Sequence, residues 1–225
     1  MDLMQNLASK IDHTLLKPDA TAEDIERLCA EAMRHQFHAV CVNGGRVELT
    51  VARLEDSGVK VASVVGFPLG GMDADAKRYE TEVAVDQGAQ EIDMVLNIGR
   101  LKDGDSDYLL REMRDVVEAA DERPVKVILE TGLLTREEKV LACRLALESG
   151  AHFVKTSTGY GPGGATVEDV RLLRETVGPN FGVKASGGIR DYATAVAMLE
   201  AGATRLGTSA GVTIVSGGDA GSKRC

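Results

Sequence analysis

Short apolar segments alternate with longer amphipathic segments along the whole chain. A buried strand followed by an amphipathic helix is the repeating unit of a parallel sheet. We count eight such repeats, whose predicted strands cover residues 10–14, 38–43, 60–67, 91–97, 124–130, 153–159, 181–188 and 204–210. Because no long linker separates the repeats, they favour one closed (β/α)8 barrel, a TIM barrel, over an open α/β sheet.

Capping residues support these boundaries. Thr21, Asp73, Thr135 and Thr166 each precede a helical pattern, and their side-chain oxygens can accept a backbone N–H at the helix start. Glycines stand where four helices should end: Gly58, Gly88, Gly150 and Gly202. We therefore predict a single domain over residues 1–225, with a short N-terminal extension and a flexible tail over about 217–225.

Alternation within each strand predicts which side chains face the barrel interior. In segment 91–97, Ile92 and Met94 should face the helices, which turns Glu91 and Asp93 inward. The same reasoning turns further residues inward, most of them polar: Asp12, Cys41, Lys126, Glu130, Lys155, Lys184 and Ser209. A purely structural core would not tolerate so many charges. The interior is therefore predicted to hold a reactive site.

Two lysines, Lys155 and Lys184, lie on adjacent predicted strands, and each follows an apolar residue. Neighbouring strands are about 4.8 Å apart, so both ammonium groups should enter one region. Such closeness favours loss of a proton from one of them, which would give the nucleophilic amine of Schiff-base chemistry. In a second interpretation, each lysine only pairs with an interior carboxylate such as Asp93 or Glu130. Asp93 could likewise move protons, directly or through water, or serve only as an ion-pair partner.

Glycines end the later predicted strands at one end of the barrel. Gly159, Gly187 and Gly188 end the two lysine strands, and Gly207 precedes Ser209. Loops after the last strands of such barrels bind phosphate through backbone N–H groups that glycine leaves accessible. Tight turns are the alternative, but three glycine clusters at the same end favour a phosphate site.

Gly159, Gly161 and Gly164 also match the G-x-G-x-x-G spacing of a dinucleotide-binding turn. Such a turn needs an acidic residue on the next strand to bind a ribose hydroxyl. The next strand carries Lys184 instead, and Pro162 interrupts the turn. We therefore reject dinucleotide binding.

Composition excludes several classes of partner. A net charge of -9 argues against nucleic acid, whose phosphates need clustered cations, although one small anion could still bind in a local pocket. No signal peptide or membrane-length apolar stretch is present. The four cysteines form no CxxC pair, which is typical of reduced cytosolic thiols and predicts no zinc site: Cys29, Cys41, Cys143 and Cys225. We expect a cytoplasmic protein without a membrane partner.

Eight motifs follow one another from about residue 10 to residue 216: KIDHTLLKPDAT, VCVN, VVGFPLG, EIDMVLNIG, VKVILETGLLT, FVKTSTGYGPGGAT, VKASGGIRDYATA and RLGTSAG. In this order they resemble the deoxyribose-phosphate aldolase family, for which the paired KTSTG and VKASGG motifs are specific. The resemblance implies a class I aldolase that reversibly cleaves 2-deoxy-D-ribose 5-phosphate into acetaldehyde and D-glyceraldehyde 3-phosphate.

The resemblance also implies a role for each candidate residue. Lys155 would form the Schiff base, Lys184 would favour its neutral form, and Asp93 would donate and accept protons through water. Asp12 and Thr158 would support the polar network. The phosphate would be bound at Gly159, Gly187, Gly188 and Ser209. No metal or organic cofactor is implied, and the expected partners are a phosphosugar, an aldehyde and further copies of the chain in a dimer or tetramer.

Two positions depart from the family pattern. Tyr160 stands where some relatives carry a lysine near the phosphate, and no tyrosine follows Tyr192, although some relatives use a C-terminal tyrosine in protonation. Because fold alone does not determine function, three alternatives stay open: a phosphosugar isomerase, another Schiff-base aldolase and a sugar-phosphate-binding protein without activity.

Overall fold

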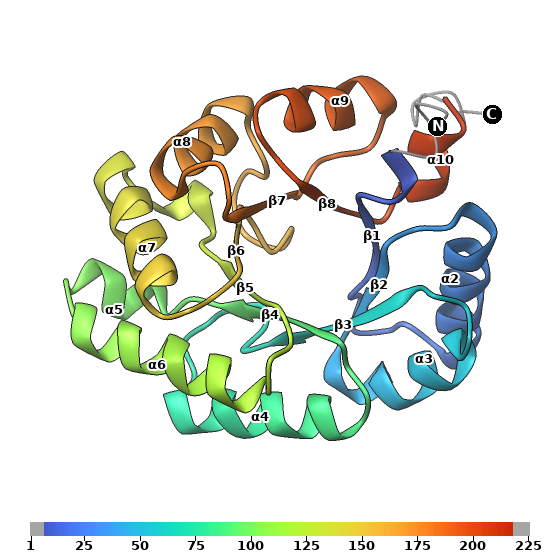
Figure 1. Cartoon of the computed structure of the whole chain (residues 1–225), viewed down its shortest axis with the longest axis horizontal. Coiled ribbons are helices and arrows are strands. Elements are labelled where there is room, and N and C mark those ends of the chain that lie inside the picture. The colour runs from blue at the N-terminus through green and yellow to red at the C-terminus, as the bar shows by residue number, and fades with distance from the viewer. Residues whose placement is uncertain (1–6, 218–225) are drawn as a thin grey trace.

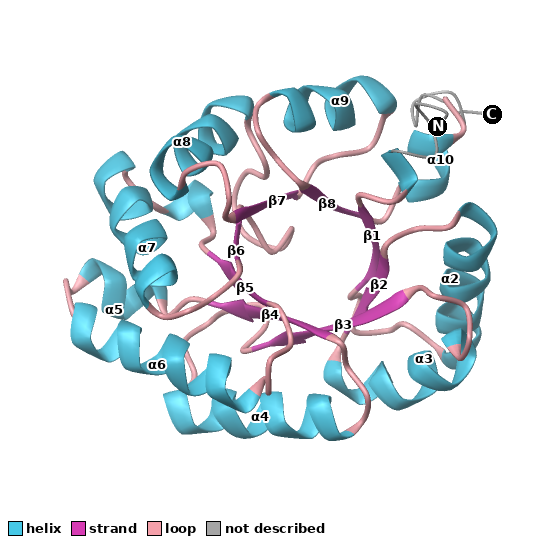
Figure 2. Cartoon of the chain, viewed as in Figure 1, coloured by secondary structure: helices cyan, strands magenta, loops and turns pink. Residues whose placement is uncertain are grey.

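The computed structural model describes residues 7–217, and eight parallel strands within them close into a barrel in sequence order. Figure 2 shows this ring of strands with the helices around it. The strands are β1 (Ile11–Leu15), β2 (Ala39–Val42), β3 (Lys60–Val65), β4 (Glu91–Val95), β5 (Val125–Ile128), β6 (Phe153–Lys155), β7 (Gly182–Ser186) and β8 (Arg205–Thr208). The predicted (β/α)8 TIM barrel is confirmed.

Helices follow every strand and cover the outside of the barrel (Figure 1). The α-helices are α2 (Ala22–His35), α3 (Val47–Leu54), α4 (Ala74–Asp86), α5 (Ile98–Lys102), α6 (Ser106–Ala119), α7 (Arg136–Glu148), α8 (Val167–Val177), α9 (Tyr192–Glu200) and α10 (Gly211–Val215). Short 3-10 turns, η1 (Gly44–Arg46) and η2 (Thr131–Leu133), precede α3 and α7. The connection after β4 contains both α5 and α6.

The predicted helix starts are confirmed. Thr21 and Thr135 each form a capping box with the third residue of α2 and of α7. Asp73 and Thr166 accept a backbone N–H at the starts of α4 and α8. Each such cap contributes about 1 kcal/mol to helix stability.

Three of the four predicted helix-end glycines lie directly after a C-capping residue. Gly88, Gly150 and Gly202 have φ angles of 98°, 84° and 112°, in the region that glycine adopts most easily. The fourth prediction is wrong, because α3 ends at Leu54 and Gly58 lies in the later turn toward β3.

Several strands end earlier than predicted. β6 stops at Lys155 and β7 at Ser186, although the predicted strands reach residues 159 and 188. Gly159 has a φ of 86° and Gly187 a φ of 90°, which a strand cannot contain. β8 ends before Ser209, which is exposed. Loops, rather than strands, therefore carry the predicted phosphate residues.

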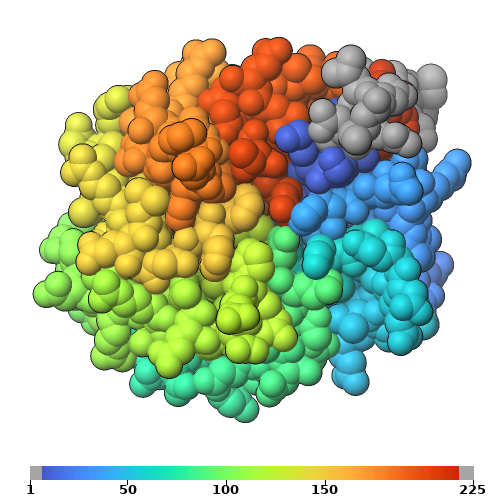
Figure 3. Space-filling view, viewed as in Figure 1, coloured from blue at the N-terminus to red at the C-terminus, as the bar shows by residue number. Residues whose placement is uncertain are grey.

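Two apolar clusters lie on opposite sides of the sheet. The larger cluster packs between strands and helices and includes the residues predicted to face outward: Val40, Val42, Ile92, Met94 and Leu96. The smaller cluster lies on the inner side and consists of Leu16, Cys41, Ala62 and Val64, with Phe67 packed against it. The predicted alternation is confirmed for these residues, but it is wrong for Ser209, which is exposed in the loop after β8 and does not face inward from a strand. The face seen in the space-filling view has no open channel at the centre of the ring (Figure 3). The interior side chains of Asp93, Lys126 and Lys184 are 0% exposed, so the interior is filled.

No helix within residues 7–217 is long and apolar enough to cross a membrane. The tail predicted over 217–225 falls outside the described residues apart from Gly217, as do the first six residues of the predicted N-terminal extension.

Candidate active site

Three lysines surround one carboxylate inside the barrel. Lys155 and Lys184 both donate to Oδ2 of Asp93 at 2.8 Å. Lys126 donates to Oδ1 of Asp93 at 2.6 Å. All four side chains are buried. The prediction that Lys155 and Lys184 enter one region is confirmed, and the two residues are register partners on β6 and β7.

Two further carboxylates and an arginine extend this cluster toward the amino ends of the strands. Asp12 accepts from Lys184 and, at 2.9 Å, from Nη1 of Arg205. Glu91 accepts from Arg205 at 3.1 Å and pairs with Lys126 at 2.7 Å. We call these seven side chains the interior network: Asp12, Glu91, Asp93, Lys126, Lys155, Lys184 and Arg205.

Sequence reasoning did not assign Lys126, Glu91 or Arg205 to the site. Lys126 and Glu91 were predicted to face inward, and adjacency to the Asp93 strand was a usable signal for Lys126. Arg205 lies four residues before Ser209 on the same predicted strand. The alternation that turned Ser209 inward therefore also applied to Arg205.

Opposite charges keep most of the interior network ionised. Burial alone would raise the pKa of Asp93, but Lys126, Lys155 and Lys184 hold it well below its usual range. Burial likewise opposes a charge on Lys184, but Asp12 and Asp93 raise the pKa of its ammonium group. At neutral pH, Asp93 is therefore a carboxylate and Lys184 a cation.

The interior network contains three carboxylates and four basic side chains. Its charges balance when one basic side chain is neutral. Lys126, Lys184 and Arg205 each contact two of the carboxylates. Among the described residues, the ion pair of Lys155 is with Asp93 alone. Loss of a proton from Lys155 therefore disturbs the fewest ion pairs.

A cavity of about 270 Å³ at the carboxyl ends of the strands reaches Lys155. Six of the predicted site residues line this strand-end cavity: Lys155, Thr158, Gly159, Gly187, Gly188 and Ser209. Asp12, Asp93 and Lys184 do not line it, because they lie within the barrel beneath it. Lys155 is thus the member of the interior network that a bound molecule would meet.

Two exposed cations line the same cavity and were missed by sequence reasoning. Lys17 lies in the loop after β1, and Arg190 lies in the loop after β7. Both belong to motifs quoted above, KIDHTLLKPDAT and VKASGGIRDYATA. Together with the left-handed glycines Gly159, Gly187 and Gly188, they make the wall of the cavity suitable for an anion.

Thr158 takes part in a separate polar contact at the cavity wall. Its hydroxyl donates to Oε2 of Glu130 and accepts the backbone N–H of Tyr160 at 3.0 Å. These bonds shape the loop that carries Gly159. The structure does not bring Thr158 together with Asp12, which belongs to the interior network.

Tyr160, which departs from the pattern expected from the family resemblance, lines the cavity. Its ring meets the ring of Phe67 edge-on, with 5.4 Å between centroids and an interplanar angle of 88°. Tyr160 therefore contributes an aromatic surface there and no positive charge, so among the described residues the basic side chains that line this cavity are Lys17, Lys155 and Arg190.

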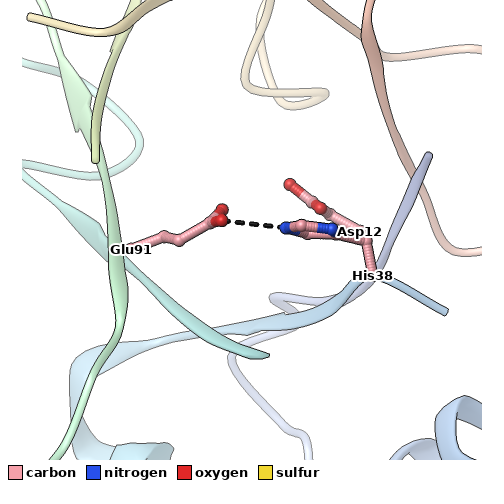
Figure 4. A group of neighbouring side chains, drawn as sticks. All are labelled: Asp12, His38 and Glu91. Atoms are coloured by element: carbon pink, nitrogen blue, oxygen red, sulfur yellow. Dashed lines mark hydrogen bonds and ion pairs between the residues drawn. The ribbon is translucent and has the colours of Figure 1, made fainter. Parts of the chain in front are cut away.

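His38 joins Asp12 and Glu91 at the amino-terminal end of the interior network (Figure 4). Its Nε2 lies 2.9 Å from Oε1 of Glu91, and the possible ligand atoms of the three residues lie within 4.8 Å of one another. That spacing would suit a metal ion. However, each carboxylate already pairs with Arg205 and with a lysine, so we assign no metal site to this group.

Comparisons with known proteins agree with one another. A model of the DeoC/LacD family aldolases matches residues 7–217. A deoxyribose-phosphate aldolase from Bdellovibrio bacteriovorus is 58% identical over 212 residues, which are 94% of this chain and 96% of that protein. One from Thermococcus gammatolerans is 59% identical over 216 residues, with the same coverage of 94% and 96%. A tetrameric deoxyribose phosphate aldolase structure from Aeropyrum pernix aligns with a TM-score of 0.89 and 36% identity over 95% of this chain and 91% of that chain.

Proposed function

Because the chain belongs to the DeoC/LacD family of aldolases, we propose that it reversibly cleaves 2-deoxy-D-ribose 5-phosphate into acetaldehyde and D-glyceraldehyde 3-phosphate. The chain is an enzyme, a carbon–carbon lyase of the aldolase class. Its proposed nucleophile is Lys155. One observation carries this assignment: Lys155 lines the strand-end cavity and has a single carboxylate partner in the interior network.

The reaction begins when the neutral amine of Lys155 attacks C1 of the open-chain sugar. The neutral adduct takes up a proton that arrives on water and loses water, which forms a C=N bond and leaves a positively charged iminium. The C2–C3 bond then breaks, its electron pair moves toward the iminium, and the C3 hydroxyl gives its proton to water. D-Glyceraldehyde 3-phosphate leaves, and an enamine stays on Lys155. Protonation at C2 followed by hydrolysis releases acetaldehyde and restores the amine.

The charge balance of the interior network favours the neutral amine that starts this reaction. With Lys155 neutral, three cations face three carboxylates. Lys184 contacts the same Asp93 oxygen as Lys155 and therefore opposes a second ammonium group there. When the iminium forms, positive charge returns to Lys155 beside Asp93, whose carboxylate stabilises it.

Asp93 is proposed to orient the two lysines and to stabilise cationic intermediates. Three lysines hold the pKa of its carboxyl well below the usual range, so its carboxylate is a poor proton donor and a weak base. The family resemblance implied that Asp93 donates and accepts protons through water, and only the electrostatic part of that role is proposed here. Protons are instead proposed to travel on water between the substrate and the lysines.

The phosphate is proposed to bind at the wall formed by Gly159, Gly187, Gly188 and Ser209. Left-handed backbone at the three glycines leaves N–H groups accessible to an anion. Lys17 and Arg190 line the same cavity and supply the positive charge that Tyr160 does not.

Further copies of the chain are proposed as partners, in a dimer or a tetramer, supported by the tetrameric relative from Aeropyrum pernix. A cytoplasmic location stays a prediction. It is supported by three cysteines that are buried and unpaired with one another: Cys29, Cys41 and Cys143.

Reduction of the enzyme with borohydride in acetaldehyde tests the Schiff base. The imine becomes a stable secondary amine, so an ethyl group stays on the nucleophile. We expect peptide mapping to find this group at Lys155 far sooner than at the exposed Lys17, and 2-deoxyribose 5-phosphate to release acetaldehyde. Labelling at Lys184 alone would reverse the roles of the two lysines, and cleavage without any label would refute the covalent mechanism.

The same assays separate the alternative functions. An isomerase would convert the phosphosugar without releasing acetaldehyde. An aldolase for dihydroxyacetone phosphate would retain that ketone after reduction. A binding protein would bind the phosphosugar without turnover.

A further inference from the structure

The interior network continues to the amino-terminal end of the barrel, where it meets His38. His38 directly precedes β2, and its Nε2 lies 2.9 Å from Oε1 of Glu91. The His38 side chain is 28% exposed, whereas those of Glu91 and Arg205 at the same end are 6% and 11% exposed. Figure 4 shows that His38 points toward Glu91, and the possible ligand atoms of Asp12 lie within 4.8 Å of those of both residues. At this end, His38 is therefore the main contact between the network and solvent.

Four consecutive contacts connect His38 to Lys155. His38 lies 2.9 Å from Glu91, and Glu91 lies 2.7 Å from Lys126. Lys126 lies 2.6 Å from Asp93, and Asp93 lies 2.8 Å from Lys155. The three side chains between the two ends are nearly or fully buried. Because buried charges are weakly screened, a charge gained at His38 acts on Lys155.

Imidazole is the side chain that ordinarily changes its charge near neutral pH. Glu91 is ionised, since Lys126, His38 and Arg205 lower the pKa of its carboxyl despite burial. Nε2 of His38 therefore donates to Glu91, and a second proton would bind at Nδ1. The charged groups around His38 are Asp12 from β1 and Glu91 from β4, with Lys126 from β5 and Arg205 from β8 beyond them.

We propose that His38 is a positioning residue that links pH at the amino-terminal end of the barrel to the charge of Lys155. This inference rests on the proposed role of Lys155 as nucleophile. A positive charge on the His38 ring opposes an ammonium group at Lys155. A larger share of Lys155 then stays neutral and reactive, so activity extends to lower pH than it would without His38.

Two substitutions of opposite charge test this link. His38→Gln keeps a donor for Glu91 but cannot gain a charge, whereas His38→Arg is always charged. We measure kcat/KM for 2-deoxyribose 5-phosphate from about pH 5 to about pH 9. His38→Gln should move the acid side of the profile upward by about half to one pH unit, and His38→Arg should move it downward. The natural protein should lie between the two variants, and the rate of borohydride labelling at Lys155 should follow the same order.

His152 provides a matched control. It directly precedes β6 as His38 precedes β2, but its Nδ1 accepts the backbone N–H of Val125 at 3.2 Å. None of the contacts described for His152 involves the interior network. His152→Gln should therefore keep the acid side of the natural profile.

The possible failures are distinguishable. Suppose that the natural protein cleaves the sugar and is labelled at Lys155. If His38→Gln and His38→Arg then have the same pH profile on the acid side, this inference alone is overturned. A natural protein that neither cleaves nor labels would refute the proposed function instead. If thermal unfolding shows that a variant does not fold, His38→Asn and His38→Lys repeat the same comparison of neutral and charged side chains.

Discussion

Two buried lysine–carboxylate clusters in this molecule differ in the charges that they favour. Lys77 on α4 pairs with Glu112 on α6 at 2.8 Å, and neither side chain is exposed. Burial lowers the pKa of Lys77 despite its partner and raises the pKa of Glu112 despite Lys77. In the interior network, Lys184 and Asp93 are equally buried, yet the pKa of Lys184 is raised and that of Asp93 is lowered.

The number of partners explains this difference better than burial does. An isolated buried pair barely repays the desolvation of two ions, so Lys77 and Glu112 tend toward their neutral forms. Lys184 contacts two carboxylates, and Asp93 contacts three lysines. Several oppositely charged partners therefore keep Lys184 and Asp93 ionised, whereas one partner is not enough to keep Lys77 and Glu112 ionised. A reactive amine can then lie at the edge of the network, where Lys155 pairs with one of the three carboxylates.

Replacing Lys155 with Met should have the largest effect on turnover and a small effect on stability. We expect activity to fall by more than about 10³-fold, because the nucleophile is lost. The midpoint of thermal unfolding should stay within about 3 °C of the natural protein, because three cations still face three carboxylates. Retro-aldol assays and calorimetry measure the two effects.

Lys184→Met is the matched control for Lys155→Met. It removes a cation that two carboxylates share, and Lys155, which pairs with Asp93, can replace that cation at Asp93 but not at Asp12. The free energy of unfolding should therefore fall by about 3 kcal/mol, more than for Lys155→Met. Equal destabilisation by the two substitutions would contradict the charge balance on which the assignment of Lys155 depends.

Removing Lys77 tests the isolated pair. Lys77→Met leaves Glu112 without a cation and should lower the free energy of unfolding by about 3 kcal/mol near pH 8. Because burial raises the pKa of Glu112, the folded variant can protonate this group in acid. The loss should therefore be smaller near pH 5 and should grow as pH rises through the raised folded-state pKa.

The double variant Lys77→Met with Glu112→Gln completes this test. Gln keeps an acceptor for the backbone N–H of Asn97, which Glu112 accepts at 3.3 Å. Urea unfolding should return to within about 1 kcal/mol of the natural protein, with little dependence on pH. A double variant as unstable as the single one would show that the pair contributes as an ion pair and would weaken the contrast with the interior network.

The sequence predicted the barrel and its inward side chains because each strand shows its apolar face by alternation. Asp93, Lys155 and Lys184 each follow an apolar residue, so their inward direction follows from parity alone. Alternation did not predict where the strands end, because strand ends depend on contacts with distant segments. Thr156 leaves β6, yet its N–H still bonds to the carbonyl of Lys184 at 3.1 Å.

Other parts of the site depend on how many charged partners each side chain meets in the folded chain, which the pattern of residues along the sequence does not contain. Lys155 differs from Lys184 in its number of carboxylate partners, and the contacts of Lys184 include Asp12, 172 positions away along the chain. Lys17 and Arg190 lie on exposed loops, where no periodicity marks the direction of a side chain. The family motifs contained both residues without indicating that they line one cavity.

The exposed wall of the strand-end cavity differs from both buried clusters because solvent reaches it. A charge substitution there should have the smallest effect on activity. Ser209 lines this cavity but is exposed, so solvent and salt screen a charge placed there. Ser209→Glu should lower kcat/KM for 2-deoxyribose 5-phosphate by roughly tenfold relative to unphosphorylated 2-deoxyribose, because it adds a negative charge beside the proposed phosphate site. Ser209→Gln, similar in size but neutral, should change this ratio much less. High salt should reduce the effect of Ser209→Glu and leave that of Lys155→Met unchanged, since Lys155 is buried. If Ser209→Glu weakens both substrates equally, Ser209 does not lie beside the phosphate, and the anion site must be assigned to Lys17, Arg190 and the glycine loops alone.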